Sequence, residues 1–157
     1  MAEAQSPTGE SVVRVDARKP LARVMIADDN LEHVATTVAL LRMEGFDVLG
    51  LPSGTALLEQ FEAFRPDAVI LDIGMPDLNG YDVARALRGN SKSAHVLLIA
   101  LTAYRSQTHK YLSQLAGFDY HLVKSADPKV LSALISDFLA GNRPVRVHVV
   151  PHRDPPG

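Results

Sequence analysis

The sequence predicts an α/β fold, in which a parallel β-sheet is sandwiched by helices. Short runs of β-branched and apolar residues alternate five times with longer segments of helical period between Leu21 and Leu139. Acidic residues directly follow two of these runs, at positions 28, 29 and 72, where an open parallel sheet places its ligand crevice. With 157 residues, of which 46% are hydrophobic, the chain suits one domain with a substantial core.

Each expected strand is a short apolar run, and each expected helix follows the strand before it. The strands are expected at residues 24–27, 46–51, 68–71, 96–101 and 120–123. The helices are expected at residues 31–44, 54–64, 81–88, 105–115 and 128–139. Regular alternation of the two kinds of element is typical of parallel sheets with crossover helices.

Residues that begin and end helices support these boundaries. Gly45 follows the first expected helix, where glycine commonly ends a helix. Ser53 is placed to cap the second helix, and Pro66 to stop it. Asp127 and Pro128 open the last helix as its cap and its first-turn proline.

The two ends of the chain differ in composition from the middle. Residues 1–20 are expected to form an N-terminal tail, because Ser, Pro, Thr, Gly and charged residues mix there. The folded domain is expected to cover residues 21–141. Residues 142–157 are expected to form a C-terminal tail, in which the alternating stretch 145–150 could add a short extra strand.

Composition excludes several classes of function. A formal net charge of -2 provides no basic field for a phosphate backbone, so direct nucleic-acid binding is not expected. Without cysteine the chain has no disulfide, no thiolate zinc site and no cysteine nucleophile. The N-terminus lacks the features of a signal peptide, and no apolar run is long enough to cross a bilayer. A soluble cytoplasmic protein without membrane insertion is expected.

Five polar residues stand at the ends of four expected strands. Asp28 and Asp29 follow the first strand, and Asp72 follows the third. Carboxylates gathered at one sheet edge repel one another, and their hard oxygen atoms suit Mg²⁺. We therefore expect substitution of Asp28 or Asp72 by asparagine to raise the melting temperature in metal-free buffer. Thr102 and Lys124 end the fourth and fifth strands, and a hydroxyl and an ammonium beside a metal can hold a transferring phosphoryl group.

Taken one at a time, these residues have simpler interpretations. Asp28 and Asn30 suit the cap of the first helix. Thr102 alone would be a strand-end residue with a satisfied hydroxyl, and Lys124 alone a solvated surface charge. The adjacent second carboxylate and Asp72 at the same edge favour a shared site instead.

Four dispersed motifs have the order and spacing of a known family. They are Ile-Ala-Asp28-Asp29-Asn, Leu-Asp72-Ile-Gly-Met-Pro76-Asp-Leu-Asn-Gly80-Tyr, Ala-Leu-Thr102-Ala and His-Leu-Val-Lys124. Over residues 21–139 the chain resembles the receiver domain of two-component response regulators, of the single-domain type. The resemblance implies a flavodoxin-like fold, with a doubly wound five-stranded parallel sheet in the order 2-1-3-4-5.

The resemblance also implies an acceptor and a metal site. Asp72 would take a phosphoryl group from a histidine of a kinase or phosphotransfer protein. Asp29 would bind Mg²⁺ directly, and Asp28 would bind it through water. Asp72 and the backbone carbonyl of Gly74 would complete the protein ligands.

Further residues would hold the phosphoryl group and report its arrival. Lys124, Thr102 and the backbone of Ala103 would bind the phosphoryl oxygens. His121 falls where the family often has an aromatic rotamer switch, and Tyr104 lies near the same face. An ordinary half-exposed strand position is the other interpretation of His121.

The implied function is signalling, with no external metabolite turned over beyond self-catalysed phosphotransfer and autodephosphorylation. The partners would be a histidine kinase or histidine phosphotransfer protein and an unknown downstream protein. A homodimer is also a possible assembly. Phosphorylation would bias a surface formed by the fourth helix, fifth strand and fifth helix.

Three alternative functions would use some of the same residues. A Mg²⁺-dependent phosphohydrolase would use Asp72 as nucleophile, but its motif needs an acid two residues later, where Gly74 stands. A receiver that works without phosphorylation is the second alternative. A nucleotide-binding module is disfavoured, because Asp28, Asp29 and Asn30 would repel phosphate.

One position departs from the family pattern. The family usually has a proline in a cis peptide after the conserved lysine, whereas Ser125 follows Lys124 here. A non-proline cis bond costs roughly 2.5 to 4 kcal/mol. We therefore expect either a trans bond with a reshaped loop or a strained cis exception, and the loop decides where Lys124 points.

Overall fold

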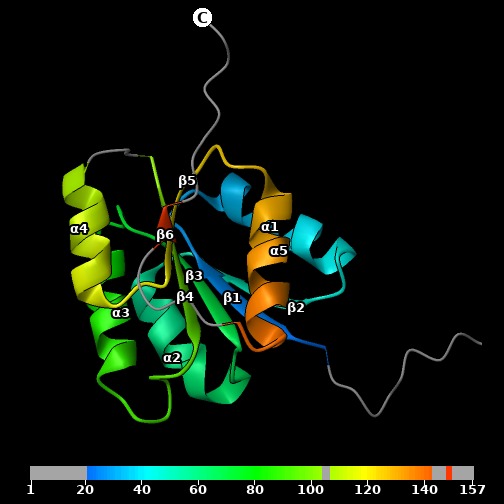
Figure 1. Ribbon diagram of the computed structural model, residues 1–157, viewed down its shortest axis with the longest axis horizontal. Coiled ribbons are helices and arrows are strands. Elements are labelled where there is room, and N and C mark those ends of the chain that lie inside the picture. The colour runs from blue at the N-terminus through cyan, green and yellow to red at the C-terminus, as the bar shows by residue number, and fades with distance from the viewer. Residues whose placement is uncertain (1–20, 104–106, 143–147, 150–157) are drawn as a thin grey trace, which may run out of the picture.

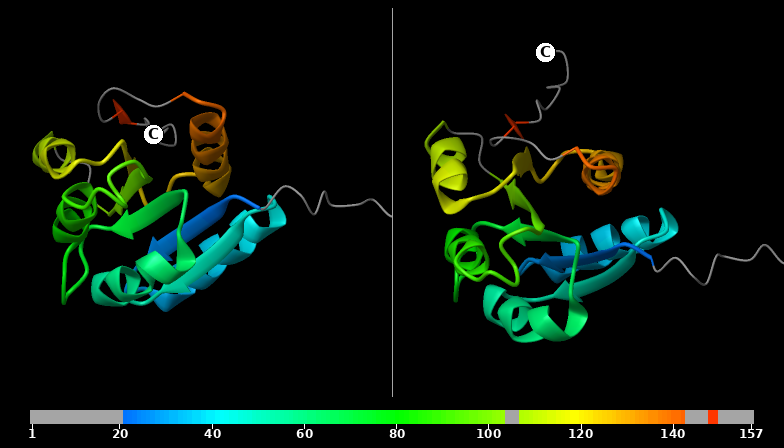
Figure 2. Two further views of the ribbon diagram at one scale, coloured as in Figure 1. Left: turned by 90° about the horizontal axis from the view of Figure 1, so that it is seen from below. Right: turned by 60° about the horizontal axis from the view of Figure 1, so that its bottom comes forward.

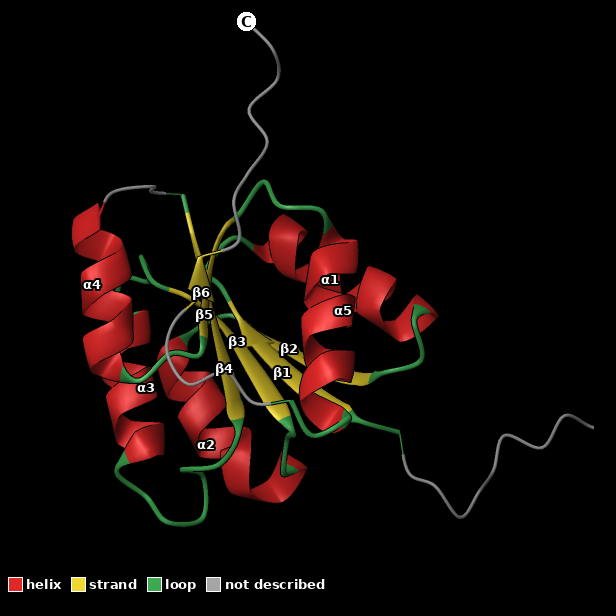
Figure 3. Cartoon of the chain, in the orientation of Figure 1, coloured by secondary structure: helices red, strands yellow, loops and turns green. Residues whose placement is uncertain are grey.

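The computed structural model describes residues 21–103, 107–142 and 148–149, and shows a parallel sheet covered by helices on both faces (Figures 1 and 3). The strand order is β2-β1-β3-β4-β5-β6. The strands are β1 Arg23–Ala27, β2 Asp47–Leu51, β3 Ala68–Asp72, β4 Leu97–Thr102, β5 Tyr120–Val123 and β6 His148–Val149. The helices are α1 Leu31–Met43, α2 Gly54–Phe64, α3 Gly80–Arg88, α4 Gln107–Ala116 and α5 Pro128–Leu139.

The sheet separates two hydrophobic cores, because successive side chains of a strand point to opposite faces. In β1, Val24 and Ile26 pack on the face covered by α1 and α5, whereas Met25 and Ala27 pack on the other face. That second face is covered by α2, α3 and α4 (Figure 2). The predicted five strands, five helices and order 2-1-3-4-5 are thereby confirmed.

Strand pairing continues slightly past two of the predicted ends. Asp72 is the last residue of β3, and Thr102 is the last residue of β4. The backbone N–H of Ile73 still donates to the carbonyl of Leu101 over 3.1 Å. Main-chain pairing does not require an apolar side chain, so the strands extend into the polar positions at the sheet edge.

The residues predicted to begin and end helices do so. The hydroxyl of Ser53 accepts from the N–H of Ala56 at the start of α2. Asp127 caps α5 directly before Pro128. Gly45 follows α1 with φ 97°, a left-handed conformation that glycine adopts without a Cβ penalty.

Arg88 connects three segments at the end of the sheet where β4 begins. Its guanidinium donates to the carbonyls of Gly117 (2.9 Å) and Val96 (2.7 Å), and it pairs with the Asp119 carboxylate over 2.8 Å. The same Asp119 oxygen accepts from the N–H of Leu98. The end of α3, the start of β4 and the loop before β5 are thus joined by one side chain.

The edge of the sheet beyond β5 carries β6. This two-residue strand pairs in parallel with β5, placing His148 opposite Tyr120 and Val149 opposite His121. Every view shows β6 in the space between α4 and α5 (Figures 1 and 2). Among the helices of the described residues, none is long and apolar enough to cross a membrane.

Candidate functional site

Three carboxylates meet at the carboxyl end of the sheet. Asp28 and Asp29 directly follow β1, and Asp72 ends the neighbouring strand β3. Each offers one oxygen atom, and these three atoms all lie within 4.8 Å of one another. Asp28 and Asp72 are buried, whereas Asp29 is exposed. The parallel pairing of β1 with β3 is what brings together residues so far apart in sequence.

The ammonium of Lys124 lies between the two buried carboxylates. Its Nζ atom is 3.0 Å from Oδ2 of Asp28 and 3.3 Å from Oδ2 of Asp72. The backbone N–H of Lys124 donates to the carbonyl of Thr102 over 2.8 Å, which extends the pairing of β4 with β5. The described residues contain no cis peptide, so the bond to Ser125 is trans, the first of the two expected outcomes.

Asp28 accepts hydrogen bonds at both carboxylate oxygens. Oδ1 accepts from the N–H of Asn30 (3.0 Å), and Oδ2 lies 2.8 Å from Nδ1 of His33. Burial disfavours its charged form, but the Asn30 N–H and the Lys124 ammonium outweigh burial and lower the pKa of Asp28. Because an ionised carboxylate only accepts, His33 donates from Nδ1.

Two findings at the start of α1 differ from the sequence interpretation. The helix cap is Asn30, whose side chain accepts from the N–H of His33, which confirms one of the two candidate caps, whereas Asp28, the other candidate, does not cap the helix. His33 itself was missed as a site residue. The available signal was a histidine in the first turn of a helix that starts beside a strand-end carboxylate.

The pKa of Asp72 is shifted in the opposite direction from that of Asp28. Burial, followed by the negative charge of Asp28, raises the pKa of Asp72 to about 6. Lys124 and the N–H of Gly74, which donates to Oδ1 over 3.2 Å, oppose that rise. The pKa of Lys124 is itself raised, because the two carboxylates outweigh the burial of its ammonium. Charge repulsion therefore raises the pKa of Asp72 alone, and the opposite pKa directions predict opposite stability effects for Asp28→Asn and Asp72→Asn.

The loop after Asp72 is held by the start of α3. The N–H of Gly80 donates to the carbonyl of Ile73 over 3.1 Å. A Cβ atom on Gly80 would lie 2.7 Å from the carbonyl oxygen of Asp72. Only glycine allows α3 to begin this close to the strand that carries the carboxylate.

The remaining predicted site residues lie on β4 and β5. Thr102 is buried at the end of β4, and Ala103 follows it exposed to solvent. Tyr104 lies outside the described residues. His121 is 1% exposed, so its interpretation as a half-exposed strand residue is wrong. Its Nδ1 atom lies 2.7 Å from the hydroxyl of buried Ser113 on α4, which connects the two elements.

The three carboxylates fit a divalent cation such as Mg²⁺. Carboxylate oxygens are hard ligands, and Mg²⁺ sites commonly combine one or two carboxylates with water. Asp29 is exposed and therefore accessible to a hydrated ion. Both oxygens of Asp28 already accept protein hydrogen bonds, which suits a contact through water better than direct coordination.

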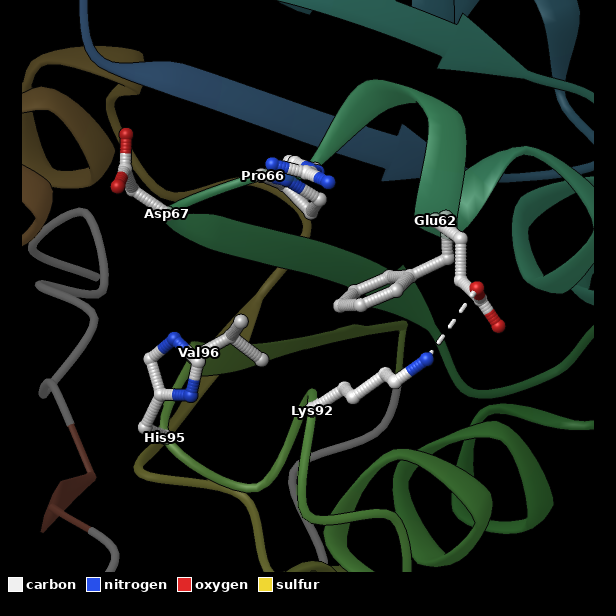
Figure 4. Close-up of a pocket in the computed structure, with 8 residues that line it drawn as sticks. Glu62, Pro66, Asp67, Lys92, His95 and Val96 are labelled. Atoms are coloured by element: carbon white, nitrogen blue, oxygen red, sulfur yellow. Dashed lines mark ion pairs between the residues drawn. The ribbon is translucent and has the colours of Figure 1, made fainter.

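A separate hollow of about 420 Å³ lies at the other end of the sheet, beside the starts of β3 and β4 (Figure 4). Its lining includes Phe61, Asp67 and Val96, and its rim holds Lys92 and Glu62, whose charged groups are 4.0 Å apart. Because Asp67 and Val96 precede their strands, this hollow is remote from the carboxylates.

Comparisons with known proteins agree with the fold. The family model for the response regulator receiver domain matches residues 24–136. The solved response regulator receiver domain protein (CheY-like) from Methanospirillum hungatei JF-1 has a TM-score of 0.71 and 25% identity, covering 77% of this chain and 95% of that chain.

Two curated relatives differ in how much of their length is matched. Protein PilH of Pseudomonas aeruginosa is 30% identical over 121 residues, which cover 77% of this chain and 100% of PilH. The DNA-binding response regulator MtrA of Mycobacterium tuberculosis is 34% identical over 120 residues, covering 76% of this chain and 51% of MtrA. The chain thus spans about half the length of the MtrA relatives that it matches.

Proposed function

Because the chain belongs to the family of response regulator receiver domains, we propose that it is a phospho-accepting signalling module of a two-component phosphorelay, with Asp72 as acceptor. The observation that supports this best is the convergence of two strand-end carboxylates on one ammonium, that of Lys124. Domains of this family are typically non-enzymatic signalling modules. Self-catalysed phosphotransfer and autodephosphorylation would be the only chemistry of this chain.

In the proposed transfer, an oxygen of Asp72 attacks the phosphorus of a phosphohistidine on a histidine kinase or histidine phosphotransfer protein. The P–O bond forms as the P–N bond breaks, and the leaving imidazole recovers a proton. Catalysis here consists mainly of positioning and charge neutralisation. Lys124 supplies a positive charge 3.3 Å from the acceptor oxygen, while Thr102 and the backbone of Ala103 border the same edge.

The proposed cation site uses the same carboxylates. Asp29 and Asp72 would coordinate Mg²⁺ directly, Asp28 through water, and the carbonyl of Gly74 would complete the protein ligands. The bound ion would neutralise charge on the carboxylates and on the phosphoryl oxygens. His33 and the N–H of Asn30 hold the Asp28 carboxylate in a fixed orientation toward this site.

A phosphohydrolase is less well supported than a receiver. Position 74, two residues after the acceptor, is a glycine whose N–H donates to Asp72. It offers no side chain that could protonate a leaving group. Slow loss of the phosphoryl group to water is therefore expected instead of rapid turnover.

The proposed output is a change at the surface of α4, β5 and α5, read by a downstream protein. Lys124 directly follows β5, and His121 within β5 contacts Ser113 on α4. A displacement of Lys124 toward a phosphoryl group therefore reaches α4 through contacts that already exist. His121 is the proposed switch residue, together with Tyr104.

Intact-mass measurement tests the proposal. The full chain incubated with acetyl phosphate and Mg²⁺ should gain one phosphoryl group, and chelation of the cation should prevent the gain. The Asp72→Asn variant should gain none. Asp77→Asn is the matched control, because Asp77 is an exposed carboxylate in the same loop and bonds Thr55 instead.

Two results would contradict the proposal. Labelling of Asp72→Asn at the wild-type level would remove Asp72 as the acceptor. No mass gain with acetyl phosphate or with a phosphorylated histidine phosphotransfer protein would indicate a receiver that works without phosphorylation.

A further inference from the structure

The strand β6 occupies the outer edge of β5. It pairs in parallel with Tyr120 and His121, in the middle of the surface formed by α4, β5 and α5 (Figures 1 and 2). A strand edge without a partner presents unpaired N–H and C=O groups that can pair with another chain. The chain thus covers with its own C-terminal segment the edge that an extended partner segment would use.

The neighbouring helix α4 carries two exposed apolar side chains. Tyr111 and Leu115 are four residues apart on α4, so they lie on one face of the helix, and each is 61% exposed. They lie on the side of α4 away from Ser113, which contacts His121 of β5, so the surface that a strand-adding segment would use is the β5 edge itself. With β6 in place, Tyr120 and His121 of β5 are already paired and are not available to a second strand.

The attachment of β6 is small enough to be reversible. It pairs over only two residues, and parallel pairs are slightly less stable per residue than antiparallel pairs. Elements held by few backbone hydrogen bonds belong to the least stable parts of a protein. A modest change in β5 can therefore decide whether β6 stays.

The carboxylate site is connected to the same part of β5. The ammonium of Lys124 forms ion pairs with Asp28 and Asp72. Lys124 comes three residues after His121, which pairs with β6. A phosphoryl group on Asp72 would draw Lys124 away from Asp28, toward oxygen atoms that lie beyond the carboxylate. In the structure, β6 pairs with β5 while Lys124 bridges the two carboxylates. A shift of Lys124 would therefore change the position of the strand with which β6 pairs.

We propose that β6 is a cover in cis for the β5 edge, and that phosphorylation of Asp72 and pairing of β6 oppose each other. This inference rests on the proposed receiver function. Release of β6 opens a strand-accepting surface between α4 and α5, which takes an extended β-forming segment of a partner protein. Because coupling is reciprocal, loss of β6 also favours the phosphorylated form.

Hydrogen exchange on the full chain tests the cover. The double variant His148→Pro and Val149→Pro removes both backbone N–H groups of β6, whereas His148→Thr and Val149→Thr keeps them. We expect faster exchange of the β5 amides in the proline variant and wild-type exchange in the threonine variant. Equal exchange in the proline variant and the wild type would overturn the cover.

Phosphorylation tests the coupling without any change in β6. Wild-type chain phosphorylated with acetyl phosphate and Mg²⁺ should lose protection in both β6 and β5, and Asp72→Asn should not respond. At one limiting concentration of acetyl phosphate, the proline variant should reach a higher phosphorylated fraction than the threonine variant. Unchanged protection in a chain whose mass shows full phosphorylation would overturn the coupling.

The two proposals fail in different ways. A chain that gains no phosphoryl group overturns the proposed function and the coupling together, while exchange in the proline variant still decides whether β6 covers β5. If the chain gains a phosphoryl group at Asp72 and β6 is not released, the proposed function stands and the coupling of phosphorylation to β6 is contradicted.

Discussion

Gly80 begins α3 directly against the main chain of Asp72. A Cβ atom at position 80 would lie 2.7 Å from the Asp72 carbonyl oxygen and 3.0 Å from Cα of Ile73. Both neighbours are backbone atoms, which cannot turn aside as a flexible side chain can. The geometry of the acceptor loop therefore depends on the absence of one methyl group.

Gly80→Ala should lower the stability of the folded chain by about 1 to 3 kcal/mol, because the added carbon overpacks the loop. Helix propensity alone predicts the opposite sign, since alanine favours a helix by about 1 kcal/mol over glycine. Urea denaturation measures the difference. Gly74→Ala is the control, since a Cβ there meets nothing within 4 Å. A stabilised Gly80→Ala variant would contradict the close contact.

Asp72→Asn should stabilise the chain in metal-free buffer, and increasingly so from pH 4 to pH 7. The folded pKa of about 6 lies above the ordinary value of 3.8, so the folded chain binds more protons across this window. Wild-type stability therefore falls as pH rises through it, by up to about 3 kcal/mol. Asparagine does not titrate and escapes this loss. Denaturation curves of both proteins at the two pH values measure the effect, and a constant difference would contradict it.

Asp28→Asn should have the opposite effect. Its lowered pKa means that the ionised carboxylate stabilises the folded chain at neutral pH, and that this contribution is lost as pH falls through the folded pKa. The variant leaves His33 and Lys124 without their shared anionic partner. We expect a lower melting temperature at pH 7. A rise as large as that of Asp72→Asn would mean that repulsion dominates at both positions.

Lys124→Met should destabilise the chain by about 1 to 3 kcal/mol at pH 7, because it leaves two adjacent buried carboxylates without their cation. The loss should shrink when Asp72→Asn is added, since one of those charges is then gone. Lys129→Met, an exposed position on α5, is the matched control. Equal denaturation midpoints for the Lys124 and Lys129 variants would show that the bridge contributes nothing measurable.

Ser113→Ala should cost about 1 to 2 kcal/mol, because it removes a hydroxyl that lies 2.7 Å from Nδ1 of buried His121. It should also weaken the connection between β5 and α4, seen as faster hydrogen exchange in α4. Ser136→Ala, at an exposed position on α5, reports the effect of the residue change alone. The same small effect for both variants would argue against a coupling role for the contact.

Most of the fold and much of the carboxylate arrangement were predictable from the sequence. Apolar runs that alternate with helical segments specify a parallel sheet, and a parallel sheet gathers strand ends at one edge. Asp28, Asp29 and Asp72 could therefore be placed together without any coordinates. Their opposite pKa directions could not, since these depend on burial and on which oxygen meets which donor.

The contacts at the start of α1 show why the rest was not predictable. Asp and Asn both suit a helix cap, so the sequence does not decide between Asp28 and Asn30. The choice depends on where the chain turns from β1 into α1, and in the structure this turn places Asn30 at the cap. The contact of His33 with Asp28 follows from the direction in which the first turn leaves the strand. Neither is encoded in a periodic pattern. Pairing of β6 with β5 likewise depends on the return path of the chain after α5.

The Arg88 contacts make the two ends of the sheet mechanically unequal. At the end where β4 begins, one guanidinium contacts Gly117, Val96 and Asp119 and so connects the end of α3 to the start of β4 and to the loop before β5. At the other end, Lys124 is held by charges that a chemical modification can redistribute. We therefore expect displacements that start at the carboxylates to be largest at the carboxyl ends of β4 and β5, and the Leu98 amide, which donates to Asp119, to exchange slowly in both phosphorylation states.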